Sequence, residues 1–217
     1  GGGTVPLDTR RPFAIVVDDV TINKLPAGKL QLKWPADYPS QANDAMHFFV
    51  YVDSTGAGFN YTHVFGTTFN TEYSGDTNAW TSEYLTDSKT YRFVVRTRDN
   101  CGNPEFNTNM FQAEADAKAP IACVVFPDTG KYYGPEKPLN ITATTTGVDL
   151  DSAWITYRRL DIPSDTWGPW LNWRGSNYMT IAGQTLFENV ALGSTPGTKG
   201  YYELYILTKD LAGNVLL

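Results

Sequence analysis

The 217-residue sequence is poor in the residues that most enzyme and metal sites need. It holds only two cysteines, Cys101 and Cys123, and two histidines, His47 and His63. Two thiols are too few for a metal cluster. A zinc site or a Ser-His-acid triad would need more partners than these histidines have. No Gly-x-Ser-x-Gly elbow and no glycine-rich phosphate loop occurs. A pair of catalytic carboxylates stays open, since its geometry does not show in a sequence. We nevertheless expect no catalytic residues and no enzyme activity here.

Positive charge and long apolar runs are also scarce. Lys and Arg total 17 against 23 Asp and Glu, which gives a net charge of −6. This balance argues against nucleic acid or an anionic membrane as a partner, because both attract basic surfaces. No stretch approaches 18 uncharged apolar residues, so we expect no membrane span in this chain. The first residues, Gly1 to Gly3, lack the features of a signal peptide and are typical of a processing scar or the boundary of an excerpt, which leaves secretion open.

Aromatic residues, in contrast, are abundant. The 13 Tyr, 11 Phe and 6 Trp make up 14% of the chain. Such rings suit the pleated, half-buried surfaces of β-sheets better than helices, so they favour an all-β protein. The length allows two domains, each large enough for a core of its own.

Two distant segments follow one template. Residues Tyr91–Asn103 and Tyr202–Asn214 both read Tyr-x-apolar-x-apolar-x-Thr-x-Asp-x-x-Gly-Asn. Their offset of about 110 residues equals one small domain, so it predicts two copies of one β-module. We place the modules at 1–117 and 118–217. The boundary lies near Ala115–Pro120, where the proline stiffens a short linker.

Alternating apolar residues predict the strands of both modules, with side chains pointing inward at every second position. The inward rows of the first module are Leu30, Leu32 and Trp34; Phe48, Val50 and Val52 on a strand from Met46; and Tyr91, Phe93, Val95 and Thr97. Those of the second are Leu139, Ile141, Ala143 and Thr145, and Tyr202, Leu204, Ile206 and Thr208, with a turn at Asp149–Asp151. Trp154 to Leu160 is also a strand, and its facing stays open because Trp154 and Ile155 are both apolar. Helices are expected to be single turns at most.

The first module resembles a fibronectin type III domain. Leu32-Lys33-Trp34 stands where that family has its buried Trp, and Leu85 precedes Tyr91 by six residues, as in the family's tyrosine corner. The second module resembles the immunoglobulin-like and fibronectin-like modules of large bacterial and archaeal surface proteins. Their penultimate strand often ends in Asp-x-Ala-Gly-Asn, here Asp210 to Asn214 after Tyr202. A longer turn over 193–200 and a Trp-rich segment depart from that family.

The resemblance implies an all-β fold of two tandem antiparallel β-sandwiches, fibronectin type III-like and then Ig-like. Only Val215-Leu216-Leu217 follow Asn214, so the second sandwich is expected to lack most of its last strand. Either the chain is a fragment, or another chain fills the open edge. The implied function is non-catalytic: structural, spacer or adhesion modules of an extracellular or cell-surface protein, which include a self-assembling surface layer or filament. The implied partners are other domains of a larger protein, other copies or surface proteins.

A cluster of rings raises an alternative function. Trp167, Trp170, Trp173 and Tyr178 fall in one short segment. They are either an aromatic platform for sugar rings or a wide hairpin that folds back over the sandwich. We favour packing, because Gly168-Pro169 marks a turn between the first two rings. Sugar binding would indicate a carbohydrate-binding accessory region of a secreted polysaccharide-degrading enzyme, with glycans as partners.

Oxygen-rich turns suggest calcium as the one candidate cofactor. The residues are Asp99 with Asn103, Asp149 with Asp151, and Asp210 with Asn214. None has the full spacing of a dedicated calcium loop. Side chains of this kind more often bind the amides of their own turn, so we favour no cofactor. Gly102 and Gly213 are expected to supply a positive φ.

The cysteines and one sequon complete the candidates. A whole return strand separates Cys101 from Cys123, which would hold them tens of Å apart, whereas a disulfide needs Cα atoms within about 7 Å. We therefore favour unpaired thiols over a disulfide, with Cys123 buried in an apolar run. Asn60-Tyr61-Thr62 fits a glycosylation site near a turn; the sequon at Asn140 falls inside a predicted strand and is read as chance.

Overall fold

The computed structural model describes residues 8–35, 47–69, 77–130, 139–145, 149–172, 180–181, 184–190 and 200–216. The chain divides into two compact units, Gly1–Ala117 and Lys118–Leu217, named unit 1 and unit 2. The regular secondary structure of the described residues consists of strands and two three-residue 3-10 helices, η1 (Val17–Asp19) and η2 (Pro26–Gly28). Within that part, no helix has the length and apolar character that crossing a bilayer requires.

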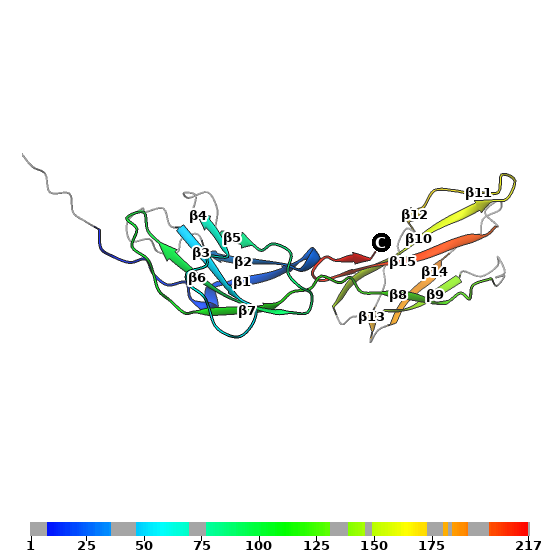
Figure 1. The fold of residues 1–217 in the computed structure, drawn as a ribbon. Coiled ribbons are helices and arrows are strands. Elements are labelled where there is room, and N and C mark those ends of the chain that lie inside the picture. The colour runs from blue at the N-terminus through cyan, green and yellow to red at the C-terminus, as the bar shows by residue number, and fades with distance from the viewer. Residues whose placement is uncertain are drawn as a thin grey trace, which may run out of the picture. The chain divides into compact units, whose positions relative to one another are not determined.

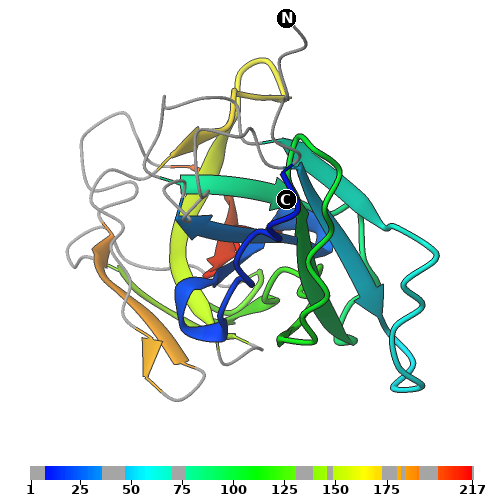
Figure 2. The same ribbon diagram turned by 90° about the vertical axis from the view of Figure 1, so that its left-hand side faces the viewer.

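Unit 1 contains two antiparallel sheets, which Figures 1 and 2 show as two layers. The first has the order β1-β2-β5, with β1 (Thr21–Leu25), β2 (Lys29–Pro35) and β5 (Thr77–Thr81). The second has the order β4-β3-β6-β7, with β4 (Gly66–Phe69), β3 (His47–Asp53), β6 (Thr90–Arg98) and β7 (Met110–Glu114). Sequence alternation placed one face of each strand inside, and the two inner faces form the core.

The core of unit 1 confirms the predicted inward rows. Leu30, Leu32, Trp34, Phe48, Val50, Phe93 and Val95 are at most 1% exposed, and all belong to one apolar cluster. The Trp34 ring lies on the Phe48 ring across the two sheets, with centroids 5.1 Å apart. Full burial of an aliphatic or aromatic side chain of this size contributes about 1.5–3 kcal/mol, so this cluster dominates the stability of the unit.

A tyrosine hydroxyl forms a hydrogen bond with the segment that precedes β6. The Thr86 backbone N–H donates a hydrogen bond to the Tyr91 hydroxyl oxygen over 3.0 Å. Tyr91 is buried, and Leu85 packs against the same core. The chain between these two residues crosses toward β6, so the bond anchors that crossing to the ring which follows it.

Unit 2 repeats the strand order of unit 1 (Figure 1). One sheet has the order β13-β14-β9-β8, with β8 (Ala122–Phe126), β9 (Leu139–Thr145), β13 (Thr180–Ile181) and β14 (Gln184–Val190). The other has the order β11-β10-β15-β16, with β10 (Leu150–Asp161), β11 (Thr166–Trp167), β15 (Tyr202–Asp210) and β16 (Val215–Leu216); β12 (Leu171–Asn172) also pairs with β10. Thus β8, β9, β10, β14, β15 and β16 correspond in order to β1, β2, β3, β5, β6 and β7. The fold is an all-β, fibronectin- and immunoglobulin-like sandwich.

Buried residues in unit 2 confirm much of the second set of inward rows. Ile141, Ile155, Ile206 and Thr208 are at most 7% exposed. Ile155 therefore faces inward, while its neighbour Trp154 is half-buried.

The predicted turn at Asp149–Asp151 is wrong. Leu150 and Asp151 belong to β10, and Leu150 pairs with Asp210 next to a register irregularity that ends at Ser152. An irregularity of this kind lets polar residues stay within a strand. The Asp151 carboxylate then forms an ion pair with Lys209 Nζ at 3.4 Å across the two strands.

Candidate functional site

In unit 1 the template turn is closed by one aspartate and one asparagine. Asp99 Oδ1 accepts a hydrogen bond from the Asn103 backbone N–H at 2.8 Å, and Asp99 Oδ2 accepts one from Asn103 Nδ2 at 2.8 Å. The Asp99 backbone pairs with Asn103 and Gly102 over 3.3 and 3.2 Å. The carboxylate and the backbone of Asp99 both form hydrogen bonds within this five-residue turn, so the turn that follows β6 is stabilised.

Unit 2 repeats this turn bond for bond. Asp210 Oδ1 accepts from the Asn214 backbone N–H at 2.7 Å, and Asp210 Oδ2 accepts from Asn214 Nδ2 at 2.8 Å. Gly102 and Gly213 both have φ of 90°, a conformation that favours glycine. The repeated arrangement of Asp, Gly and Asn is named the Asp–Asn latch. These hydrogen bonds explain why the two segments share the sequence Asp-x-x-Gly-Asn.

The latch bears on the candidate calcium ligands. In both copies each carboxylate oxygen already receives a hydrogen bond from the protein. A carboxylate oxygen of Asp149 lies within 4.8 Å of one of Asp210, whereas Asp151 is engaged by Lys209. Calcium needs six to eight oxygen ligands. These contacts favour a role of Asp99 and Asp210 in stabilising their turns.

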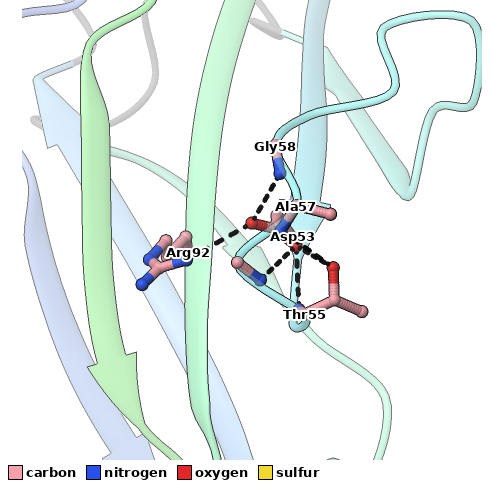
Figure 3. A network of polar contacts seen from close by, with 6 residues as sticks. Asp53, Thr55, Ala57, Gly58 and Arg92 are labelled. Carbon is pink, nitrogen blue, oxygen red and sulfur yellow. Dashed lines mark hydrogen bonds and ion pairs between the residues drawn. The ribbon is translucent and has the colours of Figure 1, made fainter.

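A second anchored loop, which the sequence analysis did not single out, follows β3 (Figure 3). Asp53 Oδ1 accepts hydrogen bonds from Thr55 N–H at 2.8 Å, from the Thr55 hydroxyl at 2.8 Å and from Gly56 N–H at 3.0 Å. Asp53 Oδ2 receives Gly58 N–H at 3.3 Å and faces Arg92 at 3.5 Å. The Thr55 amide and hydroxyl, followed by the amides of Gly58 and Gly56, lower the pKa of Asp53 to about 2. The loop therefore depends on an ionised, buried carboxylate.

An aromatic patch lies on unit 2. It is defined here as Trp167, Trp170, Tyr205, Arg158 and Glu203. The Arg158 guanidinium lies 4.9 Å from the Trp167 ring centroid and 4.7 Å from that of Trp170. Arg158 Nε also binds Glu203 Oε2 at 2.5 Å, and the Trp170 and Tyr205 centroids are 4.8 Å apart.

This patch differs in membership from the predicted ring cluster. The structure brings Trp167 and Trp170 together through Arg158, and both side chains remain about 40% exposed. Trp173 and Tyr178 lie outside the described residues. Arg158, Glu203 and Tyr205 were not predicted. Arg158 lies on β10, nine positions before Trp167 on the neighbouring strand β11. Glu203 and Tyr205 are distant in sequence, and the pairing of β10 with β15 brings them to this patch.

The thiol of Cys123 is exposed, so the prediction that it is buried is wrong. It lies on β8, the last strand in its sheet, where an apolar sequence does not imply a covered side chain. Cys101 is also exposed, in the template turn of unit 1, and neither cysteine forms a disulfide.

The remaining candidates are distributed over both units. Tyr202 in unit 2 begins β15, and its ring lies 6.3 Å from that of Tyr157. Asn60 is exposed in a turn, and its Oδ1 accepts bonds from the Thr62 amide and hydroxyl at 3.0 and 2.6 Å. His47 begins β3, and His63 lies in the exposed loop that follows. Glycosylation of Asn60 stays a prediction.

No family model matches the chain, and no curated protein matches it. Among solved structures, the chain is similar to the crystal structure of chicken CNTN1 FN1-FN3 domains, with 14% identity and a TM-score of 0.43. The match covers 96% of this chain and 66% of that chain, so this chain spans less than two thirds of its length. The fold assignment rests on the strand order and cores given above.

Proposed function

We propose that this chain is a pair of non-catalytic β-sandwich modules that serves as a spacer or adhesion element of an extracellular or cell-surface protein. The observation that carries this proposal is the Asp–Asn latch, built twice with the same hydrogen bonds. The buried carboxylates of Asp99 and Asp210 stabilise the ends of β6 and β15. A spacer or adhesion module needs such stabilisation, because it has to stay folded under load.

The family resemblance in the sequence supports the finer proposal. The segment Asp210 to Asn214 resembles modules of large bacterial and archaeal surface proteins, and assembly into a surface layer or filament would use loops and open strand edges. The partners would then be neighbouring domains, other copies of this chain or other surface proteins. The net charge of −6 disfavours nucleic acid.

Single-molecule stretching from both ends tests the mechanical role. A spacer of two independent sandwiches should unfold in two force peaks. Each unit, Gly1–Ala117 and Lys118–Leu217, should release about 30–40 nm of chain at about 3.3–3.6 Å per residue. Asn214→Ala should weaken one of the two peaks only. Extension without resolvable peaks would contradict the proposed role.

The aromatic patch favours a second candidate function, a carbohydrate-binding accessory region of a secreted polysaccharide-degrading enzyme. Trp167 and Trp170 are 38% and 40% exposed, so part of each ring remains accessible. A sugar presents flat C–H faces to such rings and hydroxyls to charged groups, and Arg158 and Glu203 would supply the latter.

Titration with soluble cello-, xylo- and chito-oligosaccharides, followed by tryptophan fluorescence, separates the two functions. Sugar binding predicts a saturable change that Trp170→Ala abolishes. The matched control is Tyr84→Ala, which removes an exposed ring from unit 1, 71% exposed. A flat response with all three sugar classes would leave the structural role ahead.

Calcium-stiffened adhesion is a variant of the structural proposal. The bonds that already occupy Asp99 and Asp210 favour the calcium-independent form. We therefore expect the same melting temperature in EDTA and in millimolar calcium. A lower melting temperature in EDTA than in calcium would instead indicate that these turns bind the metal.

A further inference from the structure

The edge strand β8 of unit 2 and the edge strand β1 of unit 1 occupy the same position in their sheets. β1 is the end strand of the order β1-β2-β5, and β8 is the end strand of the order β13-β14-β9-β8. Each pairs antiparallel with its inner neighbour, β2 or β9. Among the described residues, no strand pairs with the other side of either one. The two edges can therefore be compared directly.

Their side chains differ in a way that matters for association. β1 is Thr21-Ile22-Asn23-Lys24-Leu25, with Lys24 exposed on it. A lysine on an edge strand opposes pairing with another chain, because its charge would have to be desolvated. β8 is Ala122-Cys123-Val124-Val125-Phe126, and the whole run 119–127 contains no charged residue.

Most apolar side chains of β8, and that of Ile121 directly before it, are also exposed. Ile121 is 53% exposed, Val124 39%, Val125 53% and Phe126 36%, and Cys123 is exposed as well. Consecutive residues of a strand point to opposite faces, so both faces of this edge carry accessible apolar surface. A short, uncharged strand of apolar residues that includes two valines is the type of segment that adds to another strand.

We propose that β8 pairs antiparallel with β8 of a second copy of this chain and so joins two sheets into one. An edge that pairs with itself in this direction forms a two-fold symmetric contact, which closes as a dimer. The charges that flank the run fix the register. Lys118 and Asp128 are both exposed, and pairing centred on Cys123 places Lys118 of each copy opposite Asp128 of the other.

The choice of a second copy rests on this charge arrangement. Copies of a chain with net charge −6 repel one another. The proposed contact reduces this repulsion, because its central run is uncharged and is flanked by a lysine at one end and an aspartate at the other. The contact is short, so we expect a weak dimer, with a dissociation constant of about 10 μM or higher. This inference deepens the proposed assembly role by naming its partner, and it rests on that role only for its biological use.

Sedimentation of the full chain across a concentration series, with a reductant present, tests the contact. We expect dimers that Val125→Lys weakens by at least about tenfold, since a lysine there reproduces the protection seen on β1. Val125 is half exposed, so the variant should keep its melting temperature. The matched control is Val215→Lys on β16, 40% exposed on the other sheet of the same unit, which should dimerise as the parent does.

Crosslinking tests the register. Residues directly opposite in an antiparallel pair have Cα atoms about 4.5–5.5 Å apart, inside the range of about 4.4–6.8 Å that a disulfide accepts. With Cys101→Ser present, oxidation by copper phenanthroline should join two copies through Cys123, and adding Val125→Lys should reduce the yield. A parent chain that stays monomeric at millimolar concentration, equal effects of both lysine variants, or crosslinking unaffected by Val125→Lys would each overturn the proposal. Two force peaks in the stretching experiment would still stand in those cases, so failure of the dimer and failure of the spacer role are distinguishable.

Discussion

The Asp–Asn latch gives the sharpest prediction about stability, because the same side chain can be removed from each unit. Asn103→Ala and Asn214→Ala each delete the Nδ2 donor to a carboxylate oxygen, 2.8 Å away in both units. Both variants keep the backbone N–H that bonds the other oxygen. In unit 1 the same Nδ2 also donates a hydrogen bond to the Asp8 carbonyl oxygen at 3.1 Å, which Asn103→Ala removes as well. The bond that both variants lose is the charge-assisted one to the carboxylate, and the backbone bonds of the turn are retained.

Burial sets the size of the effect. A hydrogen bond to a charged group contributes about 1.5–3 kcal/mol, and an acceptor left buried without a donor adds to the loss. Asp210 is 0% exposed and Asp99 is 7% exposed, so water can replace the lost donor less well in unit 2. We expect about 2–3 kcal/mol for Asn214→Ala and about 1.5–2 kcal/mol for Asn103→Ala. At about 4–8 °C per kcal/mol for domains of this size, melting temperatures should drop by roughly 10 °C.

Differential scanning calorimetry of the full chain measures both effects at once. We expect two transitions, one per unit, with Asn103→Ala lowering one and Asn214→Ala lowering the other. The matched control is Leu211→Ala in the same turn, since Leu211 is 74% exposed and lies between the two residues of the latch. This control should change the free energy of unfolding of unit 2 by less than about 0.5 kcal/mol.

Two results would refute the reasoning. If Leu211→Ala lowers a transition as much as Asn214→Ala, general disturbance of the turn explains the effect. If both asparagine variants leave both transitions in place, the two carboxylates do not need the bonds described, and the latch has no energetic role.

Three further predictions concern unit 1. Tyr91→Phe should lower its stability by about 1 kcal/mol through loss of the corner hydrogen bond, while Tyr84→Phe, 71% exposed, should not; equal urea midpoints would contradict the corner. Asp53 has a folded pKa of about 2, below the unfolded value of about 3.9, so its contribution is complete above pH 4 and is lost as the pH falls toward 2. The difference in urea midpoint between the parent chain and Asp53→Asn should therefore shrink over that range, and a constant difference would argue against it. Gly66→Ala would place a Cβ 2.1 Å from Trp80 Nε1, so we expect about 1–3 kcal/mol of destabilisation from overpacking, and an unchanged midpoint would show that the ring moves freely.

Local patterns account for the parts of the fold that the sequence predicted well. Leu30, Leu32 and Trp34 alternate with polar residues, and period-two alternation suffices to tell which face of a strand is inside. The latch joins residues four positions apart, so its bonds form within one turn. Such features depend on neighbours in the chain, and their residue types are enough to indicate them.

The turn wrongly predicted at Asp149–Asp151 shows where local patterns fail. Asp is depleted in strands, yet Asp151 stays in β10, where Lys209 from the distant strand β15 pairs with it. Part of the aromatic patch was likewise beyond prediction, because Glu203 and Tyr205 reach Arg158 and Trp170 only through the register of β10 with β15.

The sequence by itself determined that this chain is all-β, that it repeats one strand-and-turn unit, and which side chains of β2 and β6 face the core of unit 1. Those properties follow from side-chain alternation and from hydrogen bonds within a few residues. Only the tertiary structure decided that β8 is an edge and that Cys123 is exposed on it. An apolar strand has the same sequence whether a neighbour covers it or not, and strand order is set by pairings between residues far apart in the chain.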